Sequence, residues 1–111
     1  MTRIIAAAAT AALLLTSTSA FAQAAFPTRP NTLQGQAACA GYTVDNYKER
    51  FAANSEGPDV QLHSLCAGAY NYYWMYLNAI RKGFSESDCN RTYDAFDKAA
   101  RVVTNFWAET H

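Results

Sequence analysis

The sequence has no excess of charge of either sign. Its 111 residues include nine basic and nine acidic side chains, so the formal net charge at pH 7 is zero. It also lacks a run rich in lysine or arginine, which is the electrostatic feature on which nucleic-acid and anionic-lipid binding depend. We therefore expect neither nucleic acid nor an anionic membrane surface as a partner.

The motifs of several common catalytic and metal-binding chemistries are also missing. Cysteine occurs three times but never as Cys-x-x-Cys, and there is no glycine-rich phosphate loop, serine-centred elbow or His-Glu-x-x-His motif. No pair of carboxylates is placed for acid–base work. The sequence therefore predicts a non-enzymatic protein without cofactor or metal, and the lack of sustained polar–apolar alternation argues against a sheet.

The first 22 residues have the pattern of a secretory signal peptide. Arg3 supplies a positive charge, an apolar stretch follows from Ile4 to Leu15, and Ala20-Phe21-Ala22 places small residues where a signal peptidase cleaves. An apolar stretch of about 12 residues is too short to span about 30 Å of hydrocarbon. We expect cleavage between Ala22 and Gln23, no stable membrane anchor afterwards, and a periplasmic or secreted protein.

The remainder is predicted to form one all-α domain, a small antiparallel three-helix bundle with one disulfide. Residues 23–31, with Pro27 and Pro30, form a flexible leader in this prediction, and residues 32–111 form the domain. Apolar residues recur at helical spacing over residues 32–53, 59–82 and 85–109. Gly83 suits the end of the second helix, and Ser85 suits the N-cap of the third.

Two of the three cysteines should pair in an oxidising compartment. With a rise of about 1.5 Å per residue, Cys39 and Cys89 lie nearly level on parallel helices, whereas Cys66 lies about 10 Å or more from both in height. The predicted bridge is Cys39–Cys89, and Cys66 is the predicted free thiol.

A free Cys66 with His63 one turn earlier raises the hypothesis of a reactive thiol, since a neighbouring imidazole lowers a thiol pKa. The alternative is a buried thiol that behaves as a small hydrophobe, because Cys66 falls in the middle of an apolar stripe. We favour the buried thiol.

The most unusual composition lies between Tyr70 and Tyr76, where five aromatic residues and a methionine occur within seven positions. At 100° per residue a single helix face cannot bury them all, and Tyr72, Trp74 and Met75 fall outside the core stripe. Exposed aromatic and methionine side chains are enriched at protein interfaces. These three residues are the predicted binding surface, and the alternative is that they only cover neighbouring helices.

We therefore expect a non-enzymatic protein-interaction module, of the inhibitor or immunity type, whose partner is another protein. The predicted Cys39–Cys89 spacing in a small exported helical protein resembles that of the periplasmic acid-stress chaperones. A chaperone-like protein is therefore the second hypothesis. Cys66 and the aromatic residues between Tyr70 and Tyr76 are not part of that resemblance. The third hypothesis is a thiol enzyme that uses Cys66 and His63. The sequence does not determine the oligomeric state.

Overall fold

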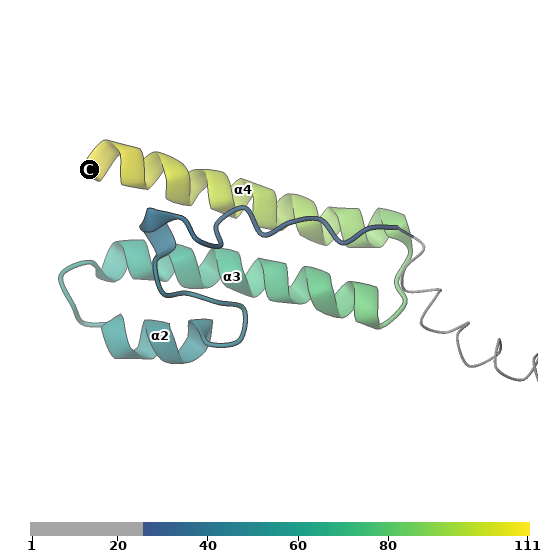
Figure 1. Ribbon diagram of the computed structural model, residues 1–111, viewed down its shortest axis with the longest axis horizontal. Coiled ribbons are helices and arrows are strands. Elements are labelled where there is room, and N and C mark those ends of the chain that lie inside the picture. The colour runs from purple at the N-terminus through teal and green to yellow at the C-terminus, as the bar shows by residue number, and fades with distance from the viewer. Residues whose placement is uncertain (1–25) are drawn as a thin grey trace, which may run out of the picture.

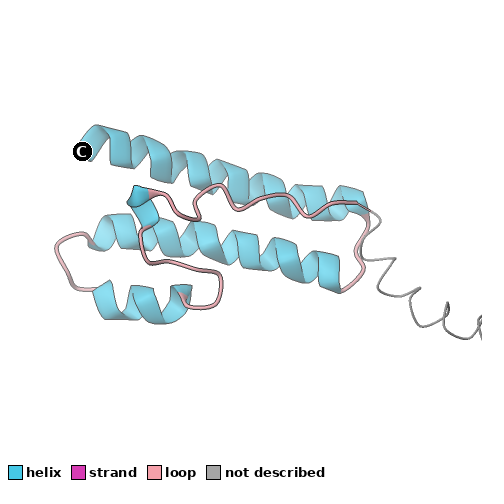
Figure 2. Cartoon of the chain, in the orientation of Figure 1, coloured by secondary structure: helices cyan, strands magenta, loops and turns pink. Residues whose placement is uncertain are grey.

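The computed structural model describes residues 26–111, which contain helices and loops and no strand (Figures 1 and 2). The elements are a short 3-10 helix η1 (Ala37–Cys39) and the α-helices α2 (Tyr47–Asn54), α3 (Val60–Arg81) and α4 (Glu86–Thr110). This confirms the predicted all-α class. The predicted signal peptide and its cleavage position lie outside the described residues.

Helices α3 and α4 run in opposite directions and pack along their lengths (Figure 1). Their ends are where the sequence predicts them. Gly83 has a φ of +81°, which favours glycine after a helix end. Ser85 caps α4, because its hydroxyl accepts a hydrogen bond from the backbone N–H of Asp88 at 3.1 Å.

The core lies between these two helices and the N-terminal segments packed on them, and it is rich in tyrosine. The ring of Tyr73 packs edge-on against Phe96, with centroids 5.1 Å apart, and Tyr76 packs in the same way against Tyr93 at 5.0 Å. Such edge-to-face pairs stabilise by about 1 kcal/mol beyond the burial of their surface. The buried residues of α4 form one helical stripe, which ends near half-buried Trp107: Cys89, Tyr93, Phe96, Ala100 and Val103.

The predicted first helix over residues 32–53 is wrong. Only its last turns form a helix, α2, and the residues before it are loop and η1. Gly35 and Gly41 have φ values of +85° and +88°, which a right-handed helix does not contain. The side chains of Thr43 and Asn46 also bond to nearby backbone groups, and such local bonds compete with a helix.

Residues 26–36 form a segment that we call the strap, which lies along the pair of helices α3 and α4 (Figure 1). Three tyrosine hydroxyls hold its backbone. The Tyr76 hydroxyl accepts a hydrogen bond from the N–H of Arg29 at 2.7 Å, and the Tyr73 hydroxyl donates to the carbonyl of Arg29 at 2.7 Å. That of Tyr93 donates to the carbonyl of Pro30 at 2.8 Å.

The side chain of Arg29 adds to this attachment. Its guanidinium lies 4.0 Å from the centre of the Tyr93 ring and donates a hydrogen bond to Asn90 at 3.1 Å. These contacts hold Arg29 and Pro30 against α3 and α4, within the segment 23–31 for which the sequence predicts a flexible leader. The bundle of three long helices is replaced by a helical hairpin, α3–α4, with the strap, η1 and α2 packed against it.

The disulfide joins Cys39 to Cys66, with a Cα–Cα distance of 5.7 Å, so the prediction of Cys39–Cys89 is wrong. Cys66 is bridged, and Cys89 is the free, buried thiol. The predicted height of Cys39 was wrong because Cys39 does not lie on a continuous first helix. In the structure Cys39 lies in η1, which packs against α3 and brings its sulfur level with Cys66.

Candidate functional site

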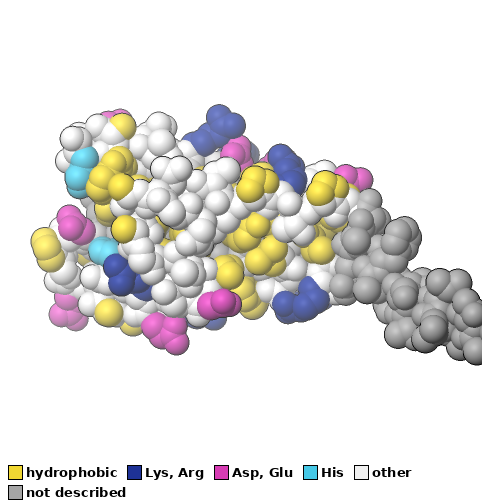
Figure 3. All heavy atoms as spheres, in the orientation of Figure 1, with side chains coloured by type: hydrophobic (Ala, Val, Ile, Leu, Met, Phe, Trp, Pro, Cys, Tyr) yellow, Lys and Arg dark blue, Asp and Glu magenta, His cyan; other side chains and the backbone are white. Residues whose placement is uncertain are grey.

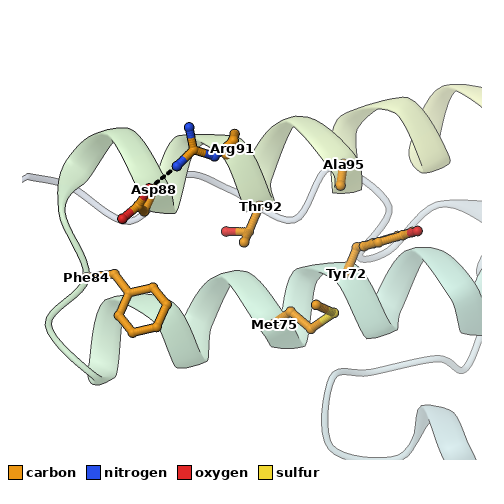
Figure 4. A pocket seen from close by; sticks show the side chains of 7 residues that line it. All are labelled: Tyr72, Met75, Phe84, Asp88, Arg91, Thr92 and Ala95. Carbon is orange, nitrogen blue, oxygen red and sulfur yellow. Dashed lines mark hydrogen bonds and ion pairs between the residues drawn. The ribbon is translucent and has the colours of Figure 1, made fainter.

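An apolar groove lies between α3 and α4, on the face away from the strap (Figure 4). In both Figure 1 and Figure 4 helix α4 lies above α3, but the α3–α4 connection lies at the right in Figure 1 and at the left in Figure 4. The two figures therefore view opposite faces. In Figure 4 the side chains of Tyr72 and Met75 from α3, Phe84 from the connection, and Thr92 and Ala95 from α4 surround a hollow of about 370 Å³. We call this surface, with the two hollows that continue it, the open groove.

The first continuation extends along α4. A hollow of about 490 Å³ shares Tyr72 and Ala95 with the first and reaches Ala99 and Val102. The second, of about 280 Å³, shares Met75 and Phe84 and reaches Trp74 and Ala79. Val102 lies ten positions after Thr92 on α4, so the groove is about 15 Å long on that side alone.

The exposure predicted for Tyr72, Trp74 and Met75 is confirmed. Their exposed fractions are 40%, 42% and 41%, while Tyr70, Tyr73 and Tyr76 are buried. Tyr72 and Met75 line the same hollow. Trp74 lies at the side of the groove, next to α2, where the ammonium of Lys48 lies 5.7 Å from its ring centre.

Sequence reasoning missed the other residues of the groove. Phe84 and Val102 are each 50% exposed and belong to this surface, as do the small side chains of α4. A signal for them is present. Thr92, Ala95, Ala99 and Val102 are spaced by three, four and three residues, which is a second apolar stripe beside the core stripe of α4.

The opposite face differs in character. Figure 3 shows the strap side, where hydrophobic atoms appear in patches between backbone and polar atoms and most charged side chains lie around the outline. The strap covers this side of the α3–α4 pair, and the tyrosine hydroxyls beneath it bond to its backbone. The open groove has no segment of residues 26–111 laid along it.

Charged side chains line the rim of the open groove. Asp88 forms an ion pair with Arg91, both within the first two turns of α4. Asp94 and Lys98 follow, and Lys82 lies at the end near the connection. Among residues 26–111, neither Lys82 nor Lys98 forms an ion pair. The rim thus carries three cations and two carboxylates.

The thiol–imidazole pair considered from the sequence does not form, because Cys66 is bridged to Cys39. His63 has a different partner. Its Nδ1 lies 2.9 Å from the hydroxyl of buried Tyr42, whose ring also packs 5.6 Å from the imidazole, centre to centre. His63 therefore holds the loop before α2 against α3.

The remaining thiol is unsuited to nucleophilic chemistry. Cys89 is fully buried, and its Sγ lies 3.7 Å from the carbonyl oxygen of Phe84. Burial, followed by the negative charges of Asp88 and Glu86, raises its pKa above the ordinary value of 9.0. Since the thiolate is the reactive form, Cys89 is a neutral core residue at physiological pH.

Within residues 26–111 no group of three or more His, Cys, Asp or Glu side chains is arranged to hold a metal ion. No helix in this part of the chain has the length and apolar character needed to cross a membrane. Comparisons with family models, curated proteins and solved structures found no match.

Proposed function

We propose that this chain is an exported, non-enzymatic module that binds another protein through the open groove, in the manner of a small inhibitor or immunity-type factor. One observation carries the proposal. Of the six large hydrophobic side chains most exposed among residues 26–111, Tyr72, Met75, Phe84, Val102 and Trp74 line a single continuous surface. An apolar surface of this kind on a small protein is a feature of interaction sites.

The composition of the surface supports a protein partner. Tyrosine, tryptophan and methionine are the residue types enriched in protein interfaces. Export is supported by the signal-like pattern of residues 1–22 and agrees with the Cys39–Cys66 bridge, because disulfides persist mainly in oxidising compartments. No cysteine thiol is exposed for nucleophilic catalysis, since Cys66 is bridged to Cys39 and Cys89 is buried.

A photoactivated cross-linking residue placed at Tyr72 in the producing cell tests this proposal. We expect an adduct with one protein at Tyr72 and no such adduct when the same residue replaces Val60, which is exposed on α3 but outside the groove. Failure to form an adduct specific to Tyr72 contradicts the proposal.

The purified partner is then titrated against alanine variants of the groove. Trp74→Ala and Met75→Ala should each weaken binding by about tenfold or more, because a few large side chains, tryptophan above all, carry most of the binding free energy of an interface. An affinity unchanged by both substitutions contradicts the proposal.

A further inference from the structure

We infer that the occupant of the open groove is an α-helix with acidic flanks, contributed by the partner protein. This inference rests on the proposed function and names the kind of segment that the groove accepts. Two features of the groove support it, namely the residues that line the groove and the charges at its rim.

The first feature is that few groups in the groove could satisfy an extended backbone. Under the strap, where this protein does hold an extended segment, the hydroxyls of Tyr73, Tyr76 and Tyr93 bond to backbone atoms. In the open groove the hydroxyl of Thr92 already donates to the carbonyl of Cys89 at 2.7 Å, and the apolar stripe of α4 continues with Ala95, Ala99 and Val102. The charged side chains of α4 lie at the rim, and the hydroxyl of Tyr72 is an uncharged polar group of the lining that has no partner among residues 26–111. A buried backbone needs hydrogen-bond partners, and a helix supplies its own.

The spacing of the lining residues matches helix packing. On α4 the stripe is Thr92, Ala95, Ala99 and Val102, and on α3 the residues Tyr72, Met75 and Ala79 follow the same alternation of three and four positions. Two such stripes side by side form the seam into which a third helix packs. The small side chains of α4 permit a helix axis to approach within about 8–10 Å.

Among residues 26–111 no third long helix covers the open groove. Residues 32–53 supply the strap's end, η1 and the short α2 in place of a long third helix. The pair α3–α4 therefore has one side covered by the strap and the other side lined by a second apolar seam. A helix from another protein would complete a three-helix arrangement on that side.

The charged side chains beside the groove favour a partner helix with acidic flanks. Arg91 and Lys98 are exposed and seven residues apart, so they occupy the same position of successive heptads beside the α4 stripe. The corresponding positions beside the α3 stripe are Asn71 and Asn78, which are uncharged. Although Asp88 pairs with Arg91 and Asp94 precedes Lys98 by one turn, cations predominate, and flanking glutamates on a partner helix would complement them.

The same charges disfavour a second copy of this chain as the occupant. Its two long helices would present either Arg91 and Lys98 again or neutral Asn71 and Asn78 at the flanking positions. Like charges repel and the amides add no opposite charge. A second copy would also bring Asp88 and Asp94, but Asp88 is already paired with Arg91, so the rim of the copy still carries more cations than carboxylates. A different protein with acidic flanks is therefore the better complement.

Synthetic peptides test the inference without the partner. Three peptides, each three heptads long, carry leucine and isoleucine at the core positions. The first has glutamate at the flanking positions, the second has lysine there, and the third is the glutamate peptide with a central proline that breaks the helix. Calorimetry should give a dissociation constant for the glutamate peptide that is lower by about tenfold or more than that of either other peptide.

Variants of the protein locate the site. Ala95→Glu in the groove should weaken the glutamate peptide by at least about tenfold, whereas Ala108→Glu, the same change at an exposed position of α4 outside the groove, should leave it unchanged. The double variant Arg91→Glu, Lys98→Glu should reverse the preference in favour of the lysine peptide. Circular dichroism of each variant checks that it is folded.

Several outcomes would overturn the inference. These are equal binding of the glutamate and lysine peptides, undiminished binding of the proline peptide, binding of none of the three, or a dimer of the chain that Ala95→Glu dissociates. If the Tyr72 adduct forms while no peptide binds, the helix inference fails and the proposed function stands. If no adduct specific to Tyr72 forms, the proposed function itself fails.

Discussion

At the scale of single residues, three tyrosine hydroxyls replace the contacts that a third long helix would make. Tyr73 and Tyr76 from α3 and Tyr93 from α4 bond to the strap at Arg29 and Pro30. Each ring also packs in the core, so one side chain supplies both apolar burial and a polar contact. The attachment of the strap therefore depends on a few named atoms.

Replacing Tyr93 with phenylalanine removes its hydrogen bond to the carbonyl of Pro30 and keeps the ring that packs against Tyr76. We expect a loss of about 0.5–1.5 kcal/mol in the free energy of unfolding, measured by urea denaturation. Tyr72→Phe is the matched control, because its hydroxyl bonds to no other residue in the range 26–111, and it should change stability by less than about 0.5 kcal/mol. Equal effects of the two substitutions would contradict the role assigned to the Tyr93 hydroxyl.

At the scale of elements, the ends of α3 and α4 follow local rules that the sequence displays. Gly83 adopts the left-handed conformation after α3, and Ser85 caps α4. The arrangement brings Phe84 between them onto the rim of the open groove. The cap thus also positions part of the candidate site.

Ser85→Ala should lower the free energy of unfolding by about 1 kcal/mol, because the N–H of Asp88 loses its acceptor. Ser87→Ala, two residues later in the first turn, is the control and should be neutral or slightly stabilising, since alanine favours helix. Thermal denaturation of both variants measures the difference. A Ser85→Ala protein as stable as the wild type would show that the cap contributes nothing.

The same local rules explain which elements could be predicted. Helices α3 and α4 have long periodic stripes with clear end signals, so their bounds agree with the prediction within one or two residues. In residues 32–53 the periodicity was also present, but Gly35 and Gly41 interrupt it and the segment folds by packing against α3. The spacing of apolar residues along the chain does not predict the tertiary contacts that decide whether such a segment forms a helix or a strap.

The candidate site was predictable in part for the same reason. Exposure of Tyr72, Trp74 and Met75 follows from their angular positions on one helix. Phe84 and Val102 join them only because α4 packs antiparallel to α3, and that pairing also determines which face the strap covers. The error in the disulfide had the same origin, since the position of Cys39 depends on η1.

At the scale of the whole molecule, one covalent bond joins the N-terminal part of the chain to the hairpin. The Cys39–Cys66 bridge closes a loop with a sequence separation of 27 and fixes η1 against α3. A bridge of this size constrains the unfolded chain by about 3.5 kcal/mol in the chain-entropy model. For a domain of this size that is a large part of the total stability.

The double variant Cys39→Ala, Cys66→Ala should therefore lose about 3 kcal/mol of stability or more in urea denaturation. A reductant should destabilise the wild-type protein to a similar degree and leave the double variant unchanged. Peptide mapping of the non-reduced protein provides an independent check on the pairing. A bridge found between Cys39 and Cys89 would contradict the structure.

Alkaline pH should destabilise the whole molecule. Burial raises the pKa of the Cys89 thiol and of five tyrosines above their ordinary values of 9.0 and 10.0, the tyrosines being Tyr42, Tyr47, Tyr70, Tyr73 and Tyr93. These groups lose protons in the unfolded state before they do so in the folded state. The free energy of unfolding is thus unaffected by them at neutral pH and falls as the pH rises above the ordinary values.

Urea denaturation at a series of pH values measures this fall, and the absorbance of tyrosinate follows the titration. Each proton released only by the unfolded state contributes a slope of about 1.4 kcal/mol per pH unit. Tyr93→Phe removes one such group, so its stability should fall less steeply. A stability that stays constant through the ordinary tyrosine pKa would contradict the burial of these hydroxyls.

The claim that the open groove binds a protein is tested most directly by one pair of matched variants. Ala95→Glu places a charge in the groove, and Ala108→Glu places the same charge on an exposed part of α4 outside it. The measurement is the dissociation constant of each variant for the protein cross-linked at Tyr72. The account predicts a rise of about tenfold or more for Ala95→Glu and no change for Ala108→Glu. Equal affinities for the two variants would contradict it.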